Sequence, residues 1–463
     1  MKPRIYLLLL LLWPLSAVGQ LPPPVLNALN QHNLDPAGLS VWVQALDAES
    51  PLLAHHAEVP RNPASVIKLL TTYAGLELLG PNYTWRTEAY PLGRLQDGVL
   101  HGDLVLKGYG DPFLTPEAFW TVLRGLHDRG VRDITGDLVL DRSFFAPAAL
   151  DPGAFDGQAD RAYNAVPDAL LLNFKAIQFS LRPDNGAVQV IASPNPANLP
   201  INNGLQLVGG RCQLDQLNFS VSTTGVNFSG RYPSACGETA LLRTVLPAEQ
   251  LAYGVFRDVW QGMGGSLGGS LREGRVANHA APLFTRYSPT LAEVIRGMNK
   301  FSNNVMTRQL LLTLGAELDS PPGTEAKGRA VIERWLQQQG LAMPELVVDN
   351  GAGLSRHTRI SARNLGRLLQ HAANSRFFPE LQASMPLLGI DGTVSRRFRN
   401  HALTGQARLK TGTLRDVRSV AGYMRTASGR DYVVVMLHNA PGVQWGVGTA
   451  VQDALLEWLY NGH

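Results

Sequence analysis

Residues 62–68 read NPASVIK, and this stretch joins helix-start chemistry to a serine and a lysine three positions apart. The Asn-Pro pair predicts the first turn of a helix. Positions i and i+3 of a helix share one face, so Ser65 and Lys68 are expected to lie side by side. Apolar residues then recur at helical spacing before Gly80-Pro81: Val66, Leu69, Leu70, Tyr73, Leu76 and Leu79. The stretch predicts a serine at the start of a buried helix.

Two further stretches complete a pattern, Ser302-Asn303-Asn304 and Lys410-Thr411-Gly412-Thr413. Each is weak alone, because a serine three residues before a lysine is usually an exposed helix pair. Lysine is scarce in this chain, however, with only seven residues, at positions 2, 68, 107, 175, 300, 327 and 410. Only Lys68 has a serine at i−3, and only Lys410 precedes Thr-Gly. We therefore interpret the three stretches as one catalytic set.

These residue types suit acyl transfer. A serine hydroxyl is a poor nucleophile, and a lysine with an ordinary pKa of about 10.4 is a poor base at neutral pH. Burial and the charge of Lys410 would lower the pKa of Lys68. Backbone N–H groups of Ser65 and of the strand around Thr413 are expected to stabilise an oxyanion.

The other two stretches are expected to handle the substrate. Ser302 and Asn304 are predicted to relay protons and hold the substrate amide. The stretch Lys410-Thr411-Gly412-Thr413 is predicted to bind a terminal carboxylate. A carboxylate pocket beside an acylating serine indicates a carboxypeptidase.

Apolar periodicity around these stretches predicts an α+β fold. Strands are expected over 39–45 and 52–56 and, near the C-terminus, over 408–411, 417–424 and 432–438, completing one antiparallel sheet. Helices are expected to flank that sheet, over 22–33, 291–298, 305–314, 328–339, 361–371 and 445–460. Between these parts the pattern changes to short strand-like runs. We predict a catalytic domain of residues 20–84 and 279–463, with a β-rich accessory region of one or two domains inserted at 85–278.

Composition and the N-terminus bear on the compartment. Apolar content is 45%, charged content is 17% and the net charge is +4, which do not indicate a nucleic-acid partner or a polytopic membrane protein. Residues 1–19 combine a basic start, an apolar run and small residues, and predict a cleaved signal peptide and a periplasmic location. An uncleaved anchor is the alternative, but it would need roughly 20 apolar residues.

In an oxidising compartment Cys212 and Cys236 could form a disulfide, and two free thiols are the alternative.

The three stretches match the active-site set of penicillin-binding proteins and serine β-lactamases. The chain further resembles the D-alanyl-D-alanine carboxypeptidase/endopeptidase family of class C penicillin-binding proteins, peptidase family S13, which is similar to penicillin-binding protein 4. Residues 102–112, 291–304 and 349–357 (DNGAGLSRH) carry this likeness. The resemblance implies that Ser65 is the acylated nucleophile, Lys68 is its base and Arg356 binds the peptide stem. A structural ion pair is the alternative for Arg356.

The same resemblance implies a penicillin-binding, β-lactamase-like fold with inserted accessory domains. It also implies peptidoglycan stem peptides ending in D-Ala-D-Ala as substrates and β-lactams as covalent inhibitors. We expect no cofactor, no metal and no nucleic-acid partner, and a homodimer is possible. A β-lactamase is an alternative, but no Glu-x-x-Leu-Asn segment follows Ser302, so slow deacylation is expected. A catalytically weak peptidoglycan-binding scaffold is the other alternative. No His-Glu-x-x-His spacing supports a metal hydrolase.

Overall fold

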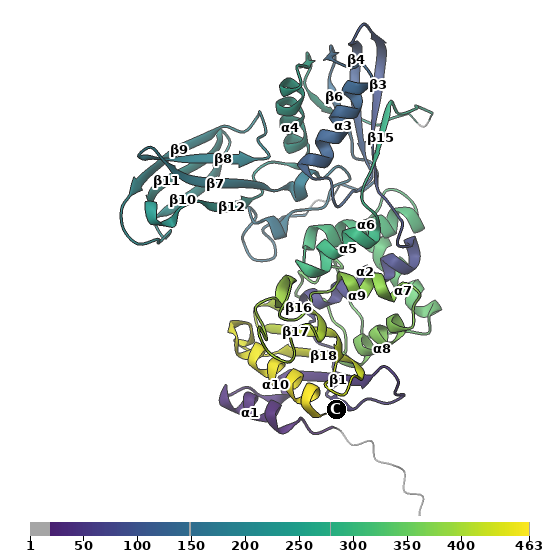
Figure 1. The fold of residues 1–463 in the computed structure, drawn as a ribbon. Helices are drawn as coiled ribbons and strands as arrows, with labels where there is room; N and C mark the ends of the chain where they lie inside the picture. The colour runs from purple at the N-terminus through teal and green to yellow at the C-terminus, as the bar shows by residue number, and fades with distance from the viewer. Residues whose placement is uncertain (1–18, 148–149, 278, 463) are drawn as a thin grey trace, which may run out of the picture.

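A computed structural model of the chain describes residues 19–147, 150–277 and 279–462 (Figure 1). The lower part of that view holds a five-stranded antiparallel sheet in the order β16-β17-β18-β1-β2. Its strands are β1 (Leu39–Ala45), β2 (Leu53–His55), β16 (Ala407–Leu414), β17 (Val417–Arg425) and β18 (Asp431–Asn439). β1 pairs with β18 along its whole length, so the first strand lies beside the last one. The predicted antiparallel sheet built from both ends of the chain is confirmed.

Helices cover both faces of this sheet. Strand β18 divides its side chains between two cores, with Val433, Val435 and Leu437 in one and Val434 and Met436 in the other. The first core packs against α2 (Lys68–Leu79), α5 (Leu291–Lys300), α6 (Asn304–Leu318), α7 (Glu325–Gln338), α8 (Ala362–Ala373) and α9 (Phe378–Ser384). The second packs against α1 (Pro23–Gln31) and α10 (Val447–Gly462). Of these helices, only α9 was not expected from the sequence.

The chain between α2 and α5 forms three further sheets, in the upper part of Figure 1. A seven-stranded sheet contains β3 (Arg86–Gln96), β4 (Val99–Gly108), β5 (Asp133–Ile134), β6 (Leu138–Asp141), β13 (Ser266–Leu267), β14 (Leu271–Glu273) and β15 (Phe284–Tyr287). Two three-stranded sheets contain β7 (Ile177–Asp184), β8 (Ala187–Ser193) and β12 (Thr239–Arg243), and β9 (Ile201–Val208), β10 (Leu217–Ser222) and β11 (Gly225–Pro233).

This region is not made of strands alone. It also contains α3 (Pro116–Asp128) and α4 (Ala248–Gly262), which the sequence analysis did not expect. Both helices pack their apolar faces into a core that belongs to the inserted region itself. Besides its strands, the inserted region therefore contains two helices that complete its core.

The inserted region leaves and rejoins the rest of the chain at one place. The backbone N–H of Ser288 donates to the carbonyl of Trp85 (2.8 Å), and the Trp85 N–H donates to the Ser288 hydroxyl (3.0 Å). The buried Trp85 indole donates to Thr313 on α6 (2.9 Å). Pairing of β3 with β15 continues this contact away from the junction. The exact boundaries at 85 and 278 stay a prediction.

Two other expectations concern single segments. A disulfide joins Cys212 and Cys236, which lie after β9 and at the end of the turn that follows β11. Residues 1–18 of the predicted signal peptide lie outside the described residues. Within the part of the chain that is described, no helix has both the length and the apolar character needed to span a membrane.

Candidate active site

Ser65 and Lys68 lie together, although the local structure differs from the prediction. Ser65 is part of a 3-10 turn, Ala64–Ile67, and the α-helix begins only at Lys68. In a 3-10 turn the side chains at i and i+3 eclipse each other, so the tighter winding brings the two residues closer together than an α-helix would. The Lys68 Nζ lies 2.9 Å from the Ser65 Oγ.

The other partners of Lys68 define what its amine can do. The side chain is fully buried, and its Nζ donates to the Asn304 Oδ1 (2.7 Å) and to the Ala352 carbonyl (2.5 Å). Both partners are pure acceptors, so they take two N–H bonds. A neutral amine has only two N–H bonds, and its lone pair then faces the Ser65 hydroxyl. This geometry suits a base that accepts the serine proton.

The pKa of Lys68 is held well below its ordinary value, first by burial and second by the charge of Lys410. Lys410 is also fully buried, and burial lowers its pKa to about 7. Neither amine has a carboxylate partner among the ion pairs of the described residues. Two nearby buried amines are unfavourable when both are charged, so the site favours one neutral lysine.

Ser302 lies in the bend between α5 and α6, and Asn304 is the first residue of α6. Ser302 has a left-handed backbone (φ 59°), and the Asn303 side chain caps α6 by accepting from the Met306 N–H (3.1 Å). This bend directs the two motif side chains to different lysines. The Lys410 Nζ donates to the Ser302 Oγ (2.8 Å), while Asn304 accepts from Lys68. A cavity of about 510 Å³ opens beside residues 302–304.

Strand β16 lies against the turn that carries Ser65. A Cβ on Gly412 would stand 3.0 Å from the Ser65 backbone N and 2.5 Å from the Pro63 carbonyl, so only glycine allows this approach. The Leu409 N–H donates to Pro386 on the side of β16 away from β17. Because N–H directions alternate along a strand, the Thr413 N–H points to that same free edge. It can therefore form an oxyanion site with the Ser65 N–H.

The structure adds partners that the sequence analysis missed. The Thr411 hydroxyl hydrogen-bonds Thr393 (2.8 Å), and Arg418 donates to the Thr413 hydroxyl (2.6 Å). Arg418 lies directly opposite Thr413 in the β16–β17 hairpin, so pairing these predicted strands would have placed it here. The Ala352 carbonyl gives no side-chain signal and could not have been found this way.

Arg356 is exposed and lies beside the turn that follows β16. Its guanidinium lies 4.6 Å from the centroid of the Phe155 ring and donates to the Arg415 carbonyl (3.5 Å). Together with Phe155 it lines a cavity of about 280 Å³ that also contains Asn350 and Ser355. Among the described residues the contacts of Arg356 are with the Phe155 ring and the Arg415 carbonyl, and its role in binding the peptide stem stays a prediction.

The antiparallel sheet flanked by helices, with Ser65 beside the buried Lys68 and Ser302 beside the buried Lys410, defines a serine peptidase of the penicillin-binding class. The chain belongs to the D-Ala-D-Ala carboxypeptidase 3 (S13) family, which it matches over residues 24–461. It is therefore a D-Ala-D-Ala carboxypeptidase of the penicillin-binding type, as the resemblance predicted.

Individual relatives agree with this family. The chain is 29% identical to a D-alanyl-D-alanine carboxypeptidase of Actinomadura sp. (strain R39), over 87% of this chain and 77% of the relative. Penicillin-binding protein 4 (dacB) from Haemophilus influenzae has a similar fold, with a TM-score of 0.80 at 22% identity, over 94% of this chain and 99% of that one. The same protein complexed with a β-lactam gives a TM-score of 0.74 at 23% identity, with the same coverage.

Proposed function

We propose that this carboxypeptidase acts on peptidoglycan stem peptides through an acyl-enzyme on Ser65. The Ser65 Oγ bonds to the carbonyl carbon of the penultimate D-Ala, and the bond to the nitrogen of the terminal residue breaks. The serine proton passes to Lys68 and reaches the leaving nitrogen through Ser302. Water then hydrolyses the ester and regenerates the hydroxyl.

One observation carries this proposal, the set of three contacts made by Lys68. Two acceptors, Asn304 and the Ala352 carbonyl, take its N–H bonds and leave its lone pair toward Ser65. A peptidoglycan-binding scaffold would have no use for a buried amine whose pKa is lowered beside a serine.

We assign recognition of the substrate carboxylate to β16. Lys410, Thr411 and Thr413 belong to this edge strand and would bind the terminal carboxylate, with Arg418 adding a second positive charge beside Thr413. The cavity beside Arg356 would take the stem peptide. A cross-linked peptide also carries a carboxylate after the cleaved bond, so we propose endopeptidase activity as well.

We also propose that β-lactams acylate Ser65 and inhibit the enzyme. The complex of the Haemophilus influenzae protein with a β-lactam supports this. No Glu-x-x-Leu-Asn segment follows Ser302 that would activate a deacylating water, so the adduct should persist. Rapid turnover of nitrocefin would instead favour the β-lactamase alternative.

The proposed compartment is the periplasm, on the basis of the N-terminal segment. It is consistent with a peptidoglycan substrate and with a disulfide in the inserted region. Homodimer formation stays a prediction.

The test is covalent labelling with a fluorescent penicillin, followed by release of alanine from a D-Ala-D-Ala pentapeptide. Wild type and Ser229→Ala, a control at an exposed serine of β11, should show both signals. Ser65→Ala should show neither while remaining folded. Absence of both signals from folded wild type would favour the scaffold alternative.

A further inference from the structure

The segment between β6 and β7 runs along α6 and forms polar contacts with one face of that helix. The Asn304 Nδ2 donates to the Tyr163 carbonyl (3.3 Å), and Arg308 donates to the Ala165 carbonyl (3.4 Å). The Gln309 amide forms two bonds with the backbone of Asp168, accepting from its N–H (3.1 Å) and donating to its carbonyl (2.8 Å). The inserted region is thereby attached to the helix that begins with Asn304.

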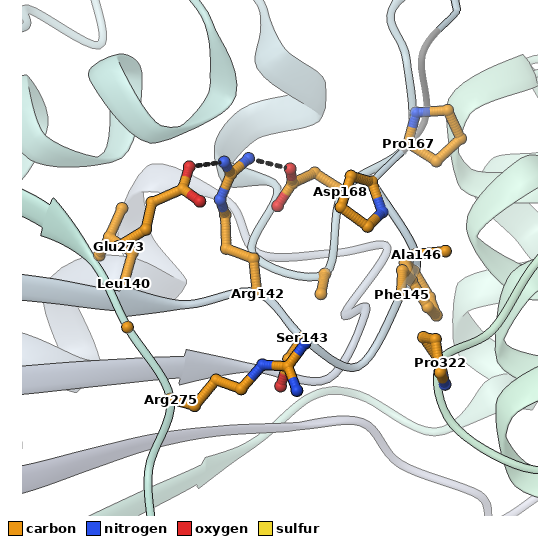
Figure 2. Close-up of a pocket in the computed structure, with 13 residues that line it drawn as sticks. Leu140, Arg142, Ser143, Phe145, Ala146, Pro167, Asp168, Glu273, Arg275 and Pro322 are labelled. Atoms are coloured by element: carbon orange, nitrogen blue, oxygen red, sulfur yellow. Dashed lines mark hydrogen bonds and ion pairs between the residues drawn. The ribbon is translucent and has the colours of Figure 1, made fainter.

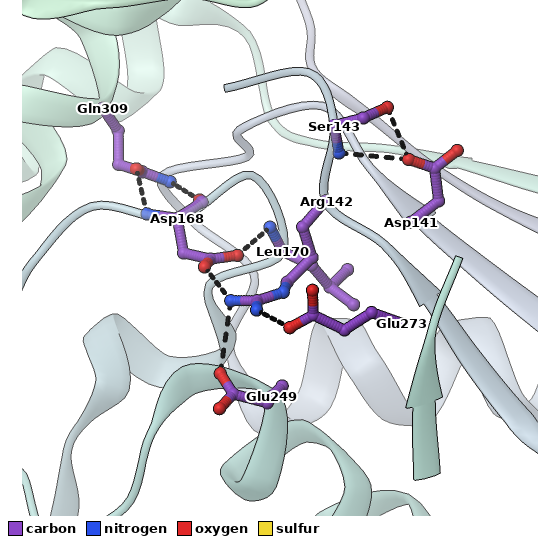
Figure 3. Close-up of polar contacts among 8 residues, drawn as sticks. All are labelled: Asp141, Arg142, Ser143, Asp168, Leu170, Glu249, Glu273 and Gln309. Atoms are coloured by element: carbon purple, nitrogen blue, oxygen red, sulfur yellow. Dashed lines mark hydrogen bonds and ion pairs between the residues drawn. The ribbon is translucent and has the colours of Figure 1, made fainter. Parts of the chain in front are cut away.

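Arg142, the first residue of this segment, binds Asp168 near the other end of it. Its guanidinium forms ion pairs with Asp168, with Glu249 of α4 and with Glu273 of β14 (Figure 3). Asp168 also accepts from the Leu170 N–H (2.9 Å). Three elements of the inserted region therefore converge on one cation and fix the position of Asp168.

Close packing alone does not hold this junction. A cavity of about 500 Å³ lies beside Arg142, between residues of the inserted region and Pro322 of the α6–α7 connection (Figure 2). Atoms that face a cavity have no packing partners on that side. Packing resumes on either side of the cavity, where Phe145 and Ala169 meet Leu312 and Ala316 of α6 and where Ala165 and Leu171 share a buried cluster with Val305. The polar contacts of Gln309 and Arg142 thus add directional bonds to this packing and hold Asp168 beside the cavity.

A shift of the 163–168 segment would affect the Lys68 amine through Asn304. Its amide has two ends, and the oxygen accepts from Lys68 while the nitrogen donates to the Tyr163 carbonyl. A shift of the 163–168 segment would free the nitrogen and let the amide rotate. The lone pair of Lys68 would then no longer be directed at Ser65.

We propose that Arg142 and Gln309 are positioning residues for acyl transfer, which fix the 163–168 segment and through it the orientation of the Asn304 amide toward Lys68. The proposal rests on the proposed acylation of Ser65. It gives the inserted region an indirect part in catalysis, through the Tyr163 carbonyl, which lies 141 residues in sequence from Asn304.

The test measures the rate of acylation by the fluorescent penicillin in Arg142→Ala, Arg142→Lys and Gln309→Leu. Misplacement of a catalytic group by about 1 Å can cost about 100-fold, so we expect acylation to slow by tenfold or more in Arg142→Ala and Gln309→Leu. Arg142→Lys keeps the charge but not the fork geometry, and should be intermediate. Arg286→Ala is the matched control, because it removes another buried ion pair of the inserted region, with Asp111.

A double-mutant cycle distinguishes positioning from general destabilisation. If Gln309 acts through Asn304, Gln309→Leu should slow acylation by less than about twofold in an Asn304→Ala background. Equal slowing in both backgrounds, or equal slowing in Arg286→Ala, would overturn the proposal. If Arg142→Ala does not fold, the neutral Gln309→Leu variant carries the test. Unlabelled wild type would instead mean that the proposed acylation itself is wrong.

Discussion

Lys68 and Lys410 are two fully buried amines whose proposed tasks need opposite charge states. Lys68 has to be neutral to accept the proton of Ser65, whereas Lys410 has to be charged to attract a carboxylate. Burial lowers the pKa of both, to about 7 for Lys410, and the charge of Lys410 further lowers that of Lys68. The two lysines thus divide the roles of base and cation between them.

This division predicts a bell-shaped pH dependence of kcat/KM for D-Ala-D-Ala peptides. The rate should rise with pH as Lys68 loses its proton, and fall as Lys410 loses its own above a pKa of about 7 in the free enzyme. A peptide with a C-terminal amide should lose the alkaline fall, because it does not need the Lys410 charge. Identical profiles for the two peptides would contradict the role of Lys410.

Replacing Lys410 should also change the titration of Lys68. In Lys410→Met the repelling charge is gone, so the ammonium form of Lys68 becomes less unfavourable and its pKa rises. The acid limb of the penicillin acylation rate should therefore move to higher pH. An acid limb that stays in place, measured on folded protein, would mean that Lys410 does not act on Lys68.

Gly412 tests the contact between β16 and the Ser65 turn. In Gly412→Ala the new Cβ would overlap the Pro63 carbonyl and the Ser65 N–H, so β16 has to move away. We expect a loss of about 1–3 kcal/mol in stability and a strong fall in acylation, since the oxyanion site widens. Gly204→Ala on β9 is the control, with its nearest contact at 3.4 Å. Equal acylation rates in the two variants would argue against an oxyanion site at this edge.

At the scale of elements, the sequence was most informative where alternation or helical spacing was strong. Strand 39–45 was predicted with the bounds that the structure has, and all of its residues are buried because helices cover both faces of its sheet. Helices α3 and α4 were missed although Phe119, Val122, Leu123 and Leu126 have helical spacing, since short strand-like runs dominate that region.

The candidate site was predictable only in its side chains. The three motifs meet as expected, but the carbonyls of Tyr163 and Ala352 that orient Asn304 and Lys68 come from distant segments. Any residue type supplies a backbone carbonyl, so no sequence pattern marks those positions. The contribution of the inserted region to the site therefore required the structure.

The disulfide between the chain after β9 and the turn after β11 gives a prediction about stability. Cys212 and Cys236 are 24 residues apart, and closing a loop of this size stabilises by about 3 kcal/mol in the chain-entropy model. The variant with both cysteines replaced by serine should unfold at lower temperature. Its penicillin acylation rate should stay unchanged, because the bridge lies outside the 163–168 segment. A parallel fall in acylation would connect the β9–β11 sheet to the active site.

At the scale of the whole molecule, the apolar core is divided in the same way as the sheets. One large cluster belongs to the inserted region, while two others lie on the two faces of the five-stranded sheet. Small clusters at residues 144–174 connect the parts through α6. A protein with separate cores and a limited junction need not unfold in one step.

This division predicts two thermal transitions that respond to different changes. Under the proposed acylation, covalent penicillin would occupy only the site at the Ser65 turn, α2, α6 and β16, so it should raise the transition of the catalytic part, as a group bound only to the folded state does. Replacing the two cysteines should lower only the transition of the inserted region. Calorimetry of wild type, labelled protein and the cysteine variant would measure both shifts. A single transition that moves in both cases would mean that the junction at Trp85, Ser288 and Gln309 couples the cores into one cooperative unit. In that case only the double-mutant cycle could separate the effect of Arg142 on acylation from its effect on global stability.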